Sequence, residues 1–359
     1  MSRAADVRAL LTRSVGETID SLLRVDLRGY RIPQILYEAA RSLTDRPLSV
    51  DAAERLVKAV QPGATVFLCT GFVFPPWGTG EHDGLGGTVI LARALEMALG
   101  ARPVVVVEEE LVPALTRMLR IGGLVPRPSF EAARGIPRTA WVTGFTKDAG
   151  TARAEAERLI RLCQPVAAVS IERPGMNAHG EYHLATGKPC TDLAAKVDHL
   201  FLALQAHGVP TVAVGDNGNE LGLGRLADAV RRDIPHGDRC VCPCGGGTAA
   251  AVGADAVVTA AVSDWGGYGL AAAVAFLADK PGALAPSSVL EHLLWTGIDS
   301  GIIDGSGYAV PAVDGVGLEY NLRLIDTLHD ILDYARRSPE KYAARFEAVL
   351  ARAGMKQEA

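Results

Sequence analysis

Residues 211–224 read TVAVGDNGNELGLG, a short apolar run followed by a loop rich in glycine and polar residues. The run 211–214 is typical of a strand buried in a parallel sheet. The loop 215–224 holds two acids, two amides and four glycines, which suit close backbone approach to a ligand and oxygen ligation of a divalent cation. Ligands of open α/β sheets bind beyond the carboxyl ends of strands. A plain strand-to-helix turn is the alternative, but this composition favours a functional site.

The alternation of strand and helix continues on both sides of this stretch. Apolar runs predict strands at 65–70, 104–107, 140–143, 166–171, 211–214 and 256–259. Apolar residues at helical spacing predict helices at 6–23, 50–60, 88–99, 148–162, 191–207, 270–277, 287–295, 318–334 and 339–353. This order predicts an α/β fold, Rossmann-like, with a mostly parallel sheet, helices on both faces and right-handed crossovers.

The chain divides into a helical N-terminal segment, 1–62, packed on the core, and an α/β domain, 63–359, with closing C-terminal helices. The first 23 residues carry arginines, as a transit peptide would, but three acids among them favour a folded helix of a cytoplasmic protein. A net charge of −5 argues against a nucleic-acid partner. No apolar run reaches the roughly 20 residues of a membrane span. We expect a small-molecule ligand, no membrane partner, and allow for a homodimer.

Six cysteines lack the spacing of a secreted disulfide scaffold, so reduced thiols are expected. Cys240, Cys242 and Cys244 alternate, which places them on one side of an extended segment. The pattern fits a soft-metal or redox site, or small buried residues near a glycine-rich turn. Because no second Cys/His cluster stands at ligand spacing, we favour small buried residues and predict no structural zinc at this triplet.

The loop 71–87 follows the first strand and is too long and too rich in glycine and proline for a routine turn, which favours a binding loop. Glu81 and Asp83 stand just ahead of the next helix, and Gly86 and Gly87 open its first turn. Backbone N–H groups there suit an anion such as a substrate carboxylate. The alternative is that Asp83 only caps the helix.

Two further strand ends repeat this arrangement. Glu172 and Arg173 follow the strand 166–171. Glu172 is suited to act as a base or a metal ligand, and Arg173 is suited to bind a carboxylate. The alternative is a surface ion pair. Trp265 lies in the glycine-rich stretch 263–269 and either lines a pocket or fills the core.

The remaining motifs carry less information. The late pairs 304–305 and 314–315 are both Asp-Gly, which is typical of plain turns. The sequence contains no Walker A string, no Gly-x-Ser-x-Gly elbow and no His-Glu-x-x-His. Strand-end loops are therefore the candidate site.

Together these motifs resemble the D-glutamate cyclase family, specifically its C-terminal, cyclase-like domain, here expected as a stand-alone chain. The matching strings are, in chain order, Arg28-Gly29, Thr70 to Phe72, Glu81 to Gly84, Ile171 to Gly175, Gly215 to Gly224, Ser263 to Tyr268 and Val313 to Gly315. The string Gly215 to Gly224 is the most specific, and the resemblance spans almost the whole chain.

The resemblance implies a hydro-lyase in which the α-amine of D-glutamate, or of a close analogue, attacks the γ-carboxyl to give 5-oxo-D-proline and water. It implies Mn²⁺ or Mg²⁺ as a Lewis acid. The metal ligands it implies are Glu81, Asp83, Asp216 and Glu220. We expect Glu172, Asp216, Glu220 and Asp83 to be the catalytic acid–base residues. We expect substrate binding by Arg173, Gly71, Gly86, Gly87, Asn217, Asn219, Asp264 and Trp265.

Two alternatives stay open. A lactam or lactone hydrolase would run the same site in reverse. A non-catalytic domain that binds a small amino or hydroxy acid would keep Arg173 and the glycine loops without an acid–base pair. The sequence also predicts that Glu81, Glu172, Asp216 and Glu220 face one cleft at the carboxyl edge of the sheet.

Overall fold

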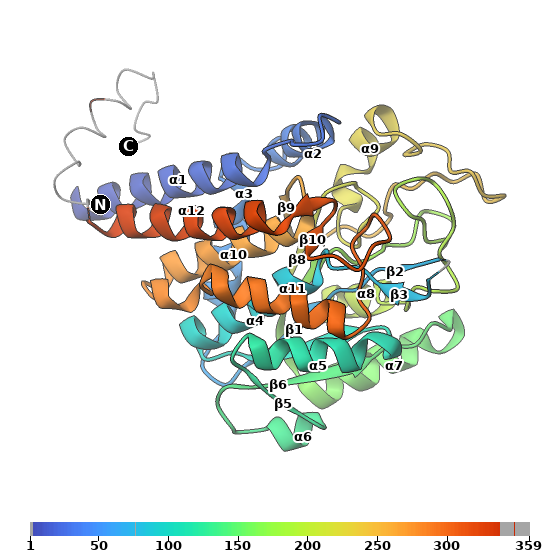
Figure 1. Ribbon diagram of the computed structural model, residues 1–359, viewed down its shortest axis with the longest axis horizontal. Helices are drawn as coiled ribbons and strands as arrows, with labels where there is room; N and C mark the ends of the chain where they lie inside the picture. The colour runs from blue at the N-terminus through green and yellow to red at the C-terminus, as the bar shows by residue number, and fades with distance from the viewer. Residues whose placement is uncertain (1–2, 76, 338–347, 349–359) are drawn as a thin grey trace.

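The computed structural model describes residues 3–75, 77–337 and 348 (Figure 1). In this part of the chain a seven-stranded parallel sheet has the order β5-β6-β4-β1-β7-β8-β9. Its strands are β1 (Thr65–Cys69), β4 (Arg102–Val107), β5 (Val125–Arg127), β6 (Thr139–Gly144), β7 (Pro165–Ile171), β8 (Thr211–Gly215) and β9 (Ala256–Thr259). Outside this sheet, β2 (Val73–Phe74) pairs with β3 (Thr79–Gly80), and β10 (Ala312–Val313) pairs with β11 (Val316–Gly317).

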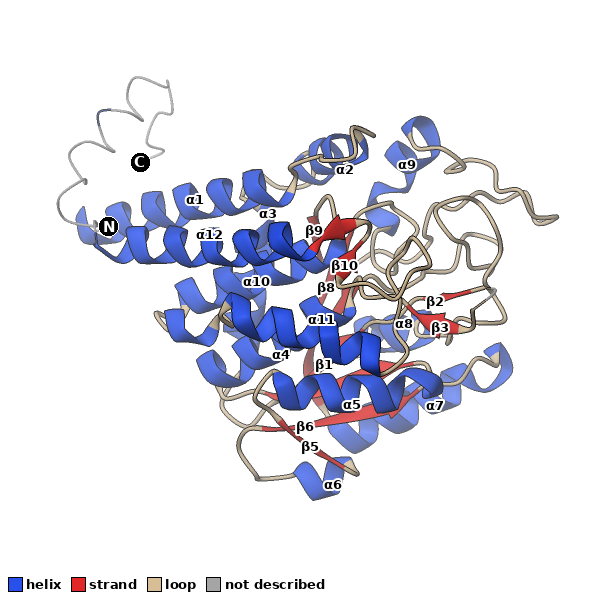
Figure 2. Ribbon diagram, in the orientation of Figure 1, coloured by secondary structure: helices blue, strands red, loops and turns tan. Residues whose placement is uncertain are grey.

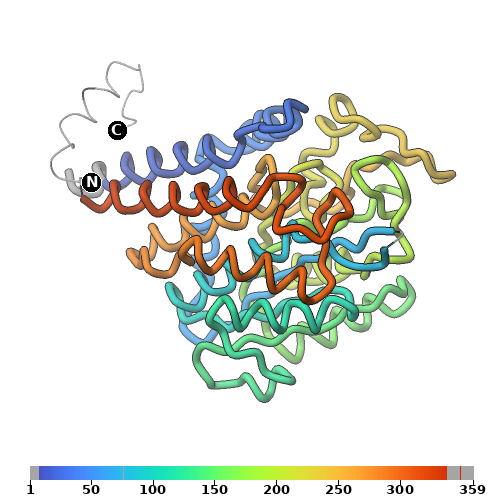
Figure 3. The backbone as a smooth tube through the Cα atoms, viewed as in Figure 1, coloured from blue at the N-terminus to red at the C-terminus, as the bar shows by residue number. Residues whose placement is uncertain are grey.

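Helices surround the sheet (Figure 2). They are α1 (Arg3–Leu23), α2 (Ile32–Arg41), α3 (Leu48–Ala59), α4 (Leu85–Leu99), α5 (Val112–Ile121), α6 (Phe130–Ala133), α7 (Ala149–Cys163), α8 (Asp198–Ala206), α9 (Ala227–Asp233), α10 (Ser263–Leu277), α11 (Ser287–Asp299) and α12 (Leu318–Arg337). Short 3₁₀ turns are η1 (Glu109–Leu111), η2 (Gly224–Leu226) and η3 (Pro281–Ala283). The helices α1 and α12 run side by side (Figure 3). No helix in the described part is both long and apolar enough to cross a bilayer.

The central strand β1 shows why both faces of the sheet are covered. All five of its residues are buried, and successive side chains point to opposite faces. Val66 and Leu68 join the core formed with α3, α4 and α10, whereas Phe67 and Cys69 join the core formed with α7 and α8. A strand that is apolar on both sides requires two helical layers. The predicted α/β fold, with a parallel sheet between helices, is therefore confirmed.

The order of the strands creates a crevice next to β1. From β1 the chain moves to β4 on one side of the sheet, and it later returns to β7 on the other side of β1. The loops that follow β1 and β7 therefore diverge at the carboxyl edge, where α/β proteins bind their ligands. The long loops gather at one end of the sheet (Figure 2).

Several segments differ from the sequence predictions, among them α2 and α9, which have no counterpart among the predicted helices. The helix predicted at 191–207 is confined to α8, because the backbone at Ala195 is held by Arg173 and Glu108. The helix predicted at 270–277 begins earlier, so the stretch 263–269 forms the first turns of α10. The edge strand β5 has no counterpart among the predicted strands, since three residues around a proline carry little pattern. The helix predicted at 339–353 lies outside the described residues apart from residue 348.

Candidate active site

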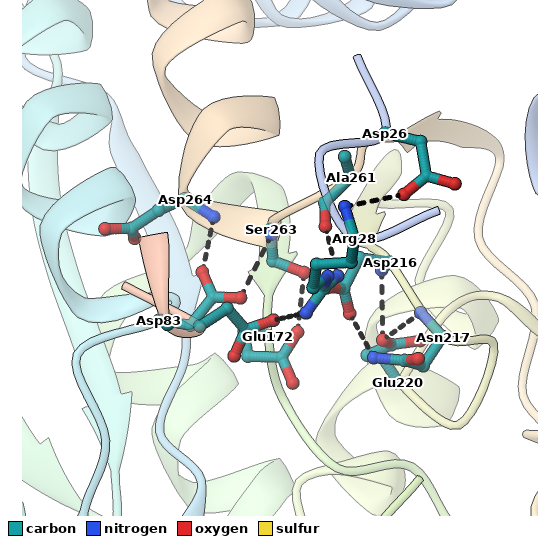
Figure 4. A network of polar contacts seen from close by, with 12 residues as sticks. Asp26, Arg28, Asp83, Glu172, Asp216, Asn217, Glu220, Ala261, Ser263 and Asp264 are labelled. Atoms are coloured by element: carbon teal, nitrogen blue, oxygen red, sulfur yellow. Dashed lines mark hydrogen bonds and ion pairs between the residues drawn. The ribbon is translucent and has the colours of Figure 1, made fainter. Parts of the chain in front are cut away.

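Acidic side chains gather at the carboxyl ends of the central strands (Figure 4). They are Glu81 and Asp83 after β1, Glu172 after β7, Asp216 and Glu220 after β8, Asp264 after β9, and Asp304 and Asp314 from the loop between α11 and α12. Asp83, Asp216 and Asp314 each offer an oxygen within 4.8 Å of the other two. Glu172, Asp216 and Glu220 form a second such group. Asp216 belongs to both groups and is therefore the centre of the cluster.

A cavity of about 440 Å³ opens beside these acids. Its lining includes Glu81, Glu172 and Asp314, and the amide residues Asn217 and Asn219. The other lining residues are Arg28, Tyr30, Phe72, Phe74, Leu184, Ala185, Thr186, Gly305, Ser306 and Gly315. The four carboxylates predicted to face one cleft only partly do so. Glu81 and Glu172 line the cavity, whereas Asp216 and Glu220 are buried beside Glu172 and do not line it.

Glu220 shapes the loop that presents Asp216. Its carboxylate accepts hydrogen bonds from the backbone N–H groups of Asp216 at 3.0 Å, Asn217 at 2.7 Å and Gly218 at 2.6 Å. Gly218 has φ +91°, and a Cβ there would lie 2.4 Å from the side chain of Val230. Only glycine therefore fits this tight loop. The glycine density of 215–224 reflects loop geometry as well as the site.

Asp83 ties the loop after β1 to the start of α10. Its carboxylate accepts from the N–H groups of Ser263 at 3.1 Å and Asp264 at 2.6 Å. The N-terminus of a helix stabilises negative charge. Asp83 does not cap the helix that follows it, α4, beyond accepting from Gly84 N–H at 2.9 Å, because the Gly87 N–H in the first turn of α4 donates to Asp264. Asp83 instead caps a distant helix and keeps one face towards Asp216 and Asp314.

Arg28 supplies a positive charge to the cluster from the segment between α1 and α2. Its guanidinium donates to Asp314 at 2.7 Å, to Asp216 at 3.2 Å and to the carbonyl of Ala261. Asp26 shapes this segment by accepting from the backbone N–H groups of Arg28 and nearby residues (Figure 4). Arg28 is not among the site residues predicted from the sequence, although the Arg28-Gly29 pair is a signal for it.

Arg173 has a different role from the one expected. It is fully buried and forms a bidentate ion pair with Glu108 at 2.5 and 2.6 Å. Its terminal nitrogens also donate to the carbonyls of Thr70, Gly71 and Ala195. Both terminal nitrogens are thus engaged inside the protein, and Arg173 does not line the cavity. Arg173 is therefore not placed to bind a substrate carboxylate, and its ion pair is not on the surface.

Five other expected substrate-binding residues also lie outside the cavity lining: Gly71, Gly86, Gly87, Asp264 and Trp265. Gly87 N–H donates to Asp264 at 2.6 Å, and a Cβ on Gly267 would lie 2.8 Å from Gly87 Cα. These glycines let α4 and α10 pack closely, so the N–H of Gly87 is not open to an anion. Trp265 is buried and donates to Asn321 at 2.8 Å, as a core residue does.

Burial and mutual repulsion dominate the electrostatics of the site. Together they raise the pKa well above its ordinary value for Glu81, Asp83, Glu172 and Asp216. Burial also raises the pKa of Asp264 to about 7 and lowers that of His82 to about 4. Carboxyl groups with raised pKa values stay neutral by binding protons, unless a bound cation compensates their charge. Their hard oxygens are the ligands that Mg²⁺ and Mn²⁺ prefer.

Backbone strain marks the same place. Glu172 and Asp314 have φ of 42° and 53°, a region that residues other than glycine rarely adopt. Such conformations persist where the surrounding structure imposes them, and they cluster at functional sites. Both residues line the cavity.

A parallel α/β sheet with a cavity and buried acids at its switch point defines a small-molecule site of the metal-binding or acid–base class. The model of the family described as "D-glutamate cyclase-like, C-terminal" matches residues 19–329, and the chain therefore belongs to this family. The chain is also 44% identical over 110 residues to the human protein named "D-glutamate cyclase, mitochondrial". That match covers 30% of this chain and only 17% of the human protein.

Proposed function

We propose that this protein is a metal-dependent D-glutamate cyclase that converts D-glutamate, or a close analogue, to 5-oxo-D-proline and water. The observation that carries this proposal is the group Asp83, Asp216 and Asp314 beside a cavity lined by Glu81 and Glu172. Family membership supports the same reaction. We infer a reducing compartment such as the cytoplasm, because none of the six cysteines forms a disulfide.

The first aspartate group fits a hard divalent cation. Oxygens bound to one Mg²⁺ or Mn²⁺ at roughly 2.0–2.2 Å lie within about 4.4 Å of one another, close to the 4.8 Å limit met by Asp83, Asp216 and Asp314. Glu220, which accepts three backbone hydrogen bonds, belongs with Glu172 and Asp216 to the second group. A bound cation would polarise the γ-carboxyl of the substrate and stabilise negative charge on its oxygens.

Glu172 and Glu81 are the proposed proton-transfer groups. Ser263 Oγ donates to Glu172 at 2.5 Å and fixes its orientation towards the cavity. A raised pKa brings a carboxylate closer to the operating pH of a general base. Glu172 takes one proton from the substrate ammonium group, which frees the lone pair that attacks the γ-carbon, and later passes this proton to the departing oxygen. Glu81, protonated because burial raises its pKa, gives that oxygen its second proton, so that it leaves as water, and regains a proton from the nitrogen as the amide forms. The substrate closes its own five-membered ring, so the protein needs only to hold it folded.

The proposal is tested by measuring 5-oxoproline release from D-glutamate in the presence of Mn²⁺, with L-glutamate and a chelator-treated sample as controls. Turnover of D-glutamate that the chelator abolishes supports the cyclase. Hydrolysis of 5-oxo-D-proline without measurable cyclisation supports the hydrolase. Binding of D-glutamate with a defined Kd but no turnover in either direction would identify a non-catalytic binding domain.

Arg28, and not Arg173, is the arginine that we propose for binding the α-carboxylate, because it lines the cavity. Arg28→Met should raise the KM for D-glutamate about 10- to 100-fold, since a charged hydrogen bond contributes about 1.5–3 kcal/mol. Arg24→Met is the matched control, because Arg24 pairs with Gln34 away from the cavity. Steady-state kinetics on both variants measure the KM for D-glutamate. A KM unchanged in Arg28→Met would remove Arg28 from substrate binding.

Metal binding should also stabilise the protein in a pH-dependent way. The native pKa values of the clustered carboxyls are raised, so the unfolded chain releases their protons more easily. In the metal-free protein these groups therefore destabilise the fold progressively as the pH rises above about 4, the ordinary carboxyl value. We expect Tm of the metal-free protein to fall between about pH 5 and about pH 8.

Added Mn²⁺ should reverse this loss, because it replaces the protons that the acids otherwise need. The expected gain is about 2.7 kcal/mol at a concentration 100 times the Kd, and it should be larger at high pH. Thermal unfolding with and without Mn²⁺ measures the effect, and Asp216→Asn should reduce it. An equal, pH-independent gain in wild type and Asp216→Asn would show that the ion binds elsewhere.

A further inference from the structure

The cysteine triplet has a fourth member that the sequence analysis missed. Cys242 Sγ lies 3.2 Å and Cys244 Sγ lies 3.6 Å from Nε2 of His183, a residue 59 positions before Cys242. Cys240 Sγ lies 3.4 Å from Cys242 Sγ and 3.3 Å from Cys244 Sγ. All four ligand atoms lie within 4.8 Å of one another. The prediction of no structural zinc assumed that no complementary ligand was present, and that assumption is wrong.

The four atoms have the chemistry and spacing of a closed tetrahedral site. With Zn–S near 2.3 Å and Zn–N near 2.0–2.1 Å, the edges of a zinc tetrahedron are about 3.6–3.8 Å. The observed separations of 3.2–3.6 Å need only a small outward shift to admit the ion. A disulfide is a different arrangement, because its sulfurs lie about 2.05 Å apart, and all three cysteines are free.

Surrounding groups support thiolates at this place. Gly246 N–H points to Cys244 Sγ at 3.4 Å, and the side-chain amide of Asn177 points to the same sulfur at 3.6 Å. Asn177 also donates to the carbonyl of Gly247 at 2.8 Å, which fixes the turn that follows the triplet. Hydrogen bonds of this kind orient metal ligands and stabilise their charge.

We propose that His183, Cys240, Cys242 and Cys244 form a structural zinc site. Three thiolates and one imidazole are soft ligands that select zinc over Mg²⁺ or Mn²⁺. The site is separate from the carboxylate cluster in residues and in chemistry, and it does not depend on the proposed cyclase reaction.

The zinc would stabilise the wall of the cavity formed by residues 183–186. His183 is followed directly by Leu184, Ala185 and Thr186, which line the cavity. The carbonyl of His183 accepts from Asn219 at 2.9 Å, and Asn219 lines the same cavity. An ion that joins His183 to the Cys240–Cys244 loop therefore holds the 183–186 wall against the loop after β8. The expected role is to order this wall.

Two measurements on the full-length protein test the site. Elemental analysis of protein purified from zinc-supplemented cells should give about one zinc per chain, as expected for one closed four-ligand site. Protein produced in cobalt-supplemented medium should show thiolate-to-cobalt charge-transfer absorption and the strong visible bands of tetrahedral cobalt. The cobalt spectrum of the wild type does not require any variant to fold.

Matched variants locate the ion. Cys242→Ser should lose the zinc and the charge-transfer band, whereas Cys163→Ser, at the end of α7, should keep both. Asp216→Asn should also keep both, because it alters only the carboxylate cluster. The proposal is overturned if the wild type holds no zinc, if Asp216→Asn and not Cys242→Ser loses it, or if mass spectrometry finds a disulfide within the triplet.

Discussion

Asp216→Asn should lower the rate of 5-oxoproline formation by a factor of about 10² or more, the scale usual for acid–base groups. Asp216 is the residue shared by both carboxylate groups, and it also pairs with Arg28. The substitution keeps the shape of the side chain but removes its charge. The rate is measured as 5-oxoproline released from D-glutamate with Mn²⁺ present.

The fold should survive this change. Asp216 is buried among like charges that raise its pKa, so an amide removes repulsion, although its pairing with Arg28 weakens. Asp228→Asn is a suitable control, because the side chain of Asp228 is fully exposed on α9. Thermal unfolding should give similar Tm values for both variants. Full activity of Asp216→Asn would mean that residues 215–224 form only a turn.

The fold could be predicted largely because its strands are apolar on both faces. Runs such as 211–214 and 166–171 have few other interpretations when turns and helical spacing flank them. The segment 191–197 could not be predicted, because a helix-compatible sequence is held in turns by Arg173 and Glu108 from elsewhere in the chain. Tertiary hydrogen bonds outweigh helix propensity there.

The gathering of acids was predictable for a related reason: the carboxyl ends of parallel strands meet at one edge. What the sequence could not show was the direction of each side chain beyond that edge. Glu172 and Arg173 are neighbours, yet Glu172 lines the cavity and Arg173 is buried beside Glu108. Asp314 was expected in a plain turn, and His183 carried no local signal. In each case the deciding partner is distant in sequence.

The ion pair of Arg173 and Glu108 should be among the strongest determinants of stability. Both side chains are fully buried, and the pair joins the residue that follows β4 to the loop after β7. Glu108→Gln keeps the shape but leaves the buried guanidinium without a counter-charge. Removing one partner of a buried pair costs about 3–5 kcal/mol. We therefore expect the free energy of unfolding, measured in urea, to fall by this amount.

Two comparisons separate this structural role from substrate binding. Glu110→Gln is the control, since Glu110 pairs with Lys147 on the surface and its loss should cost at most about 1 kcal/mol. The double variant Glu108→Leu/Arg173→Met should lose less stability than the summed losses of the single variants Glu108→Leu and Arg173→Met, because the two side chains are coupled. If Glu108→Gln instead leaves the free energy of unfolding unchanged and raises the KM for D-glutamate, Arg173 binds the substrate after all. The buried, fully engaged guanidinium makes the loss of stability the expected result.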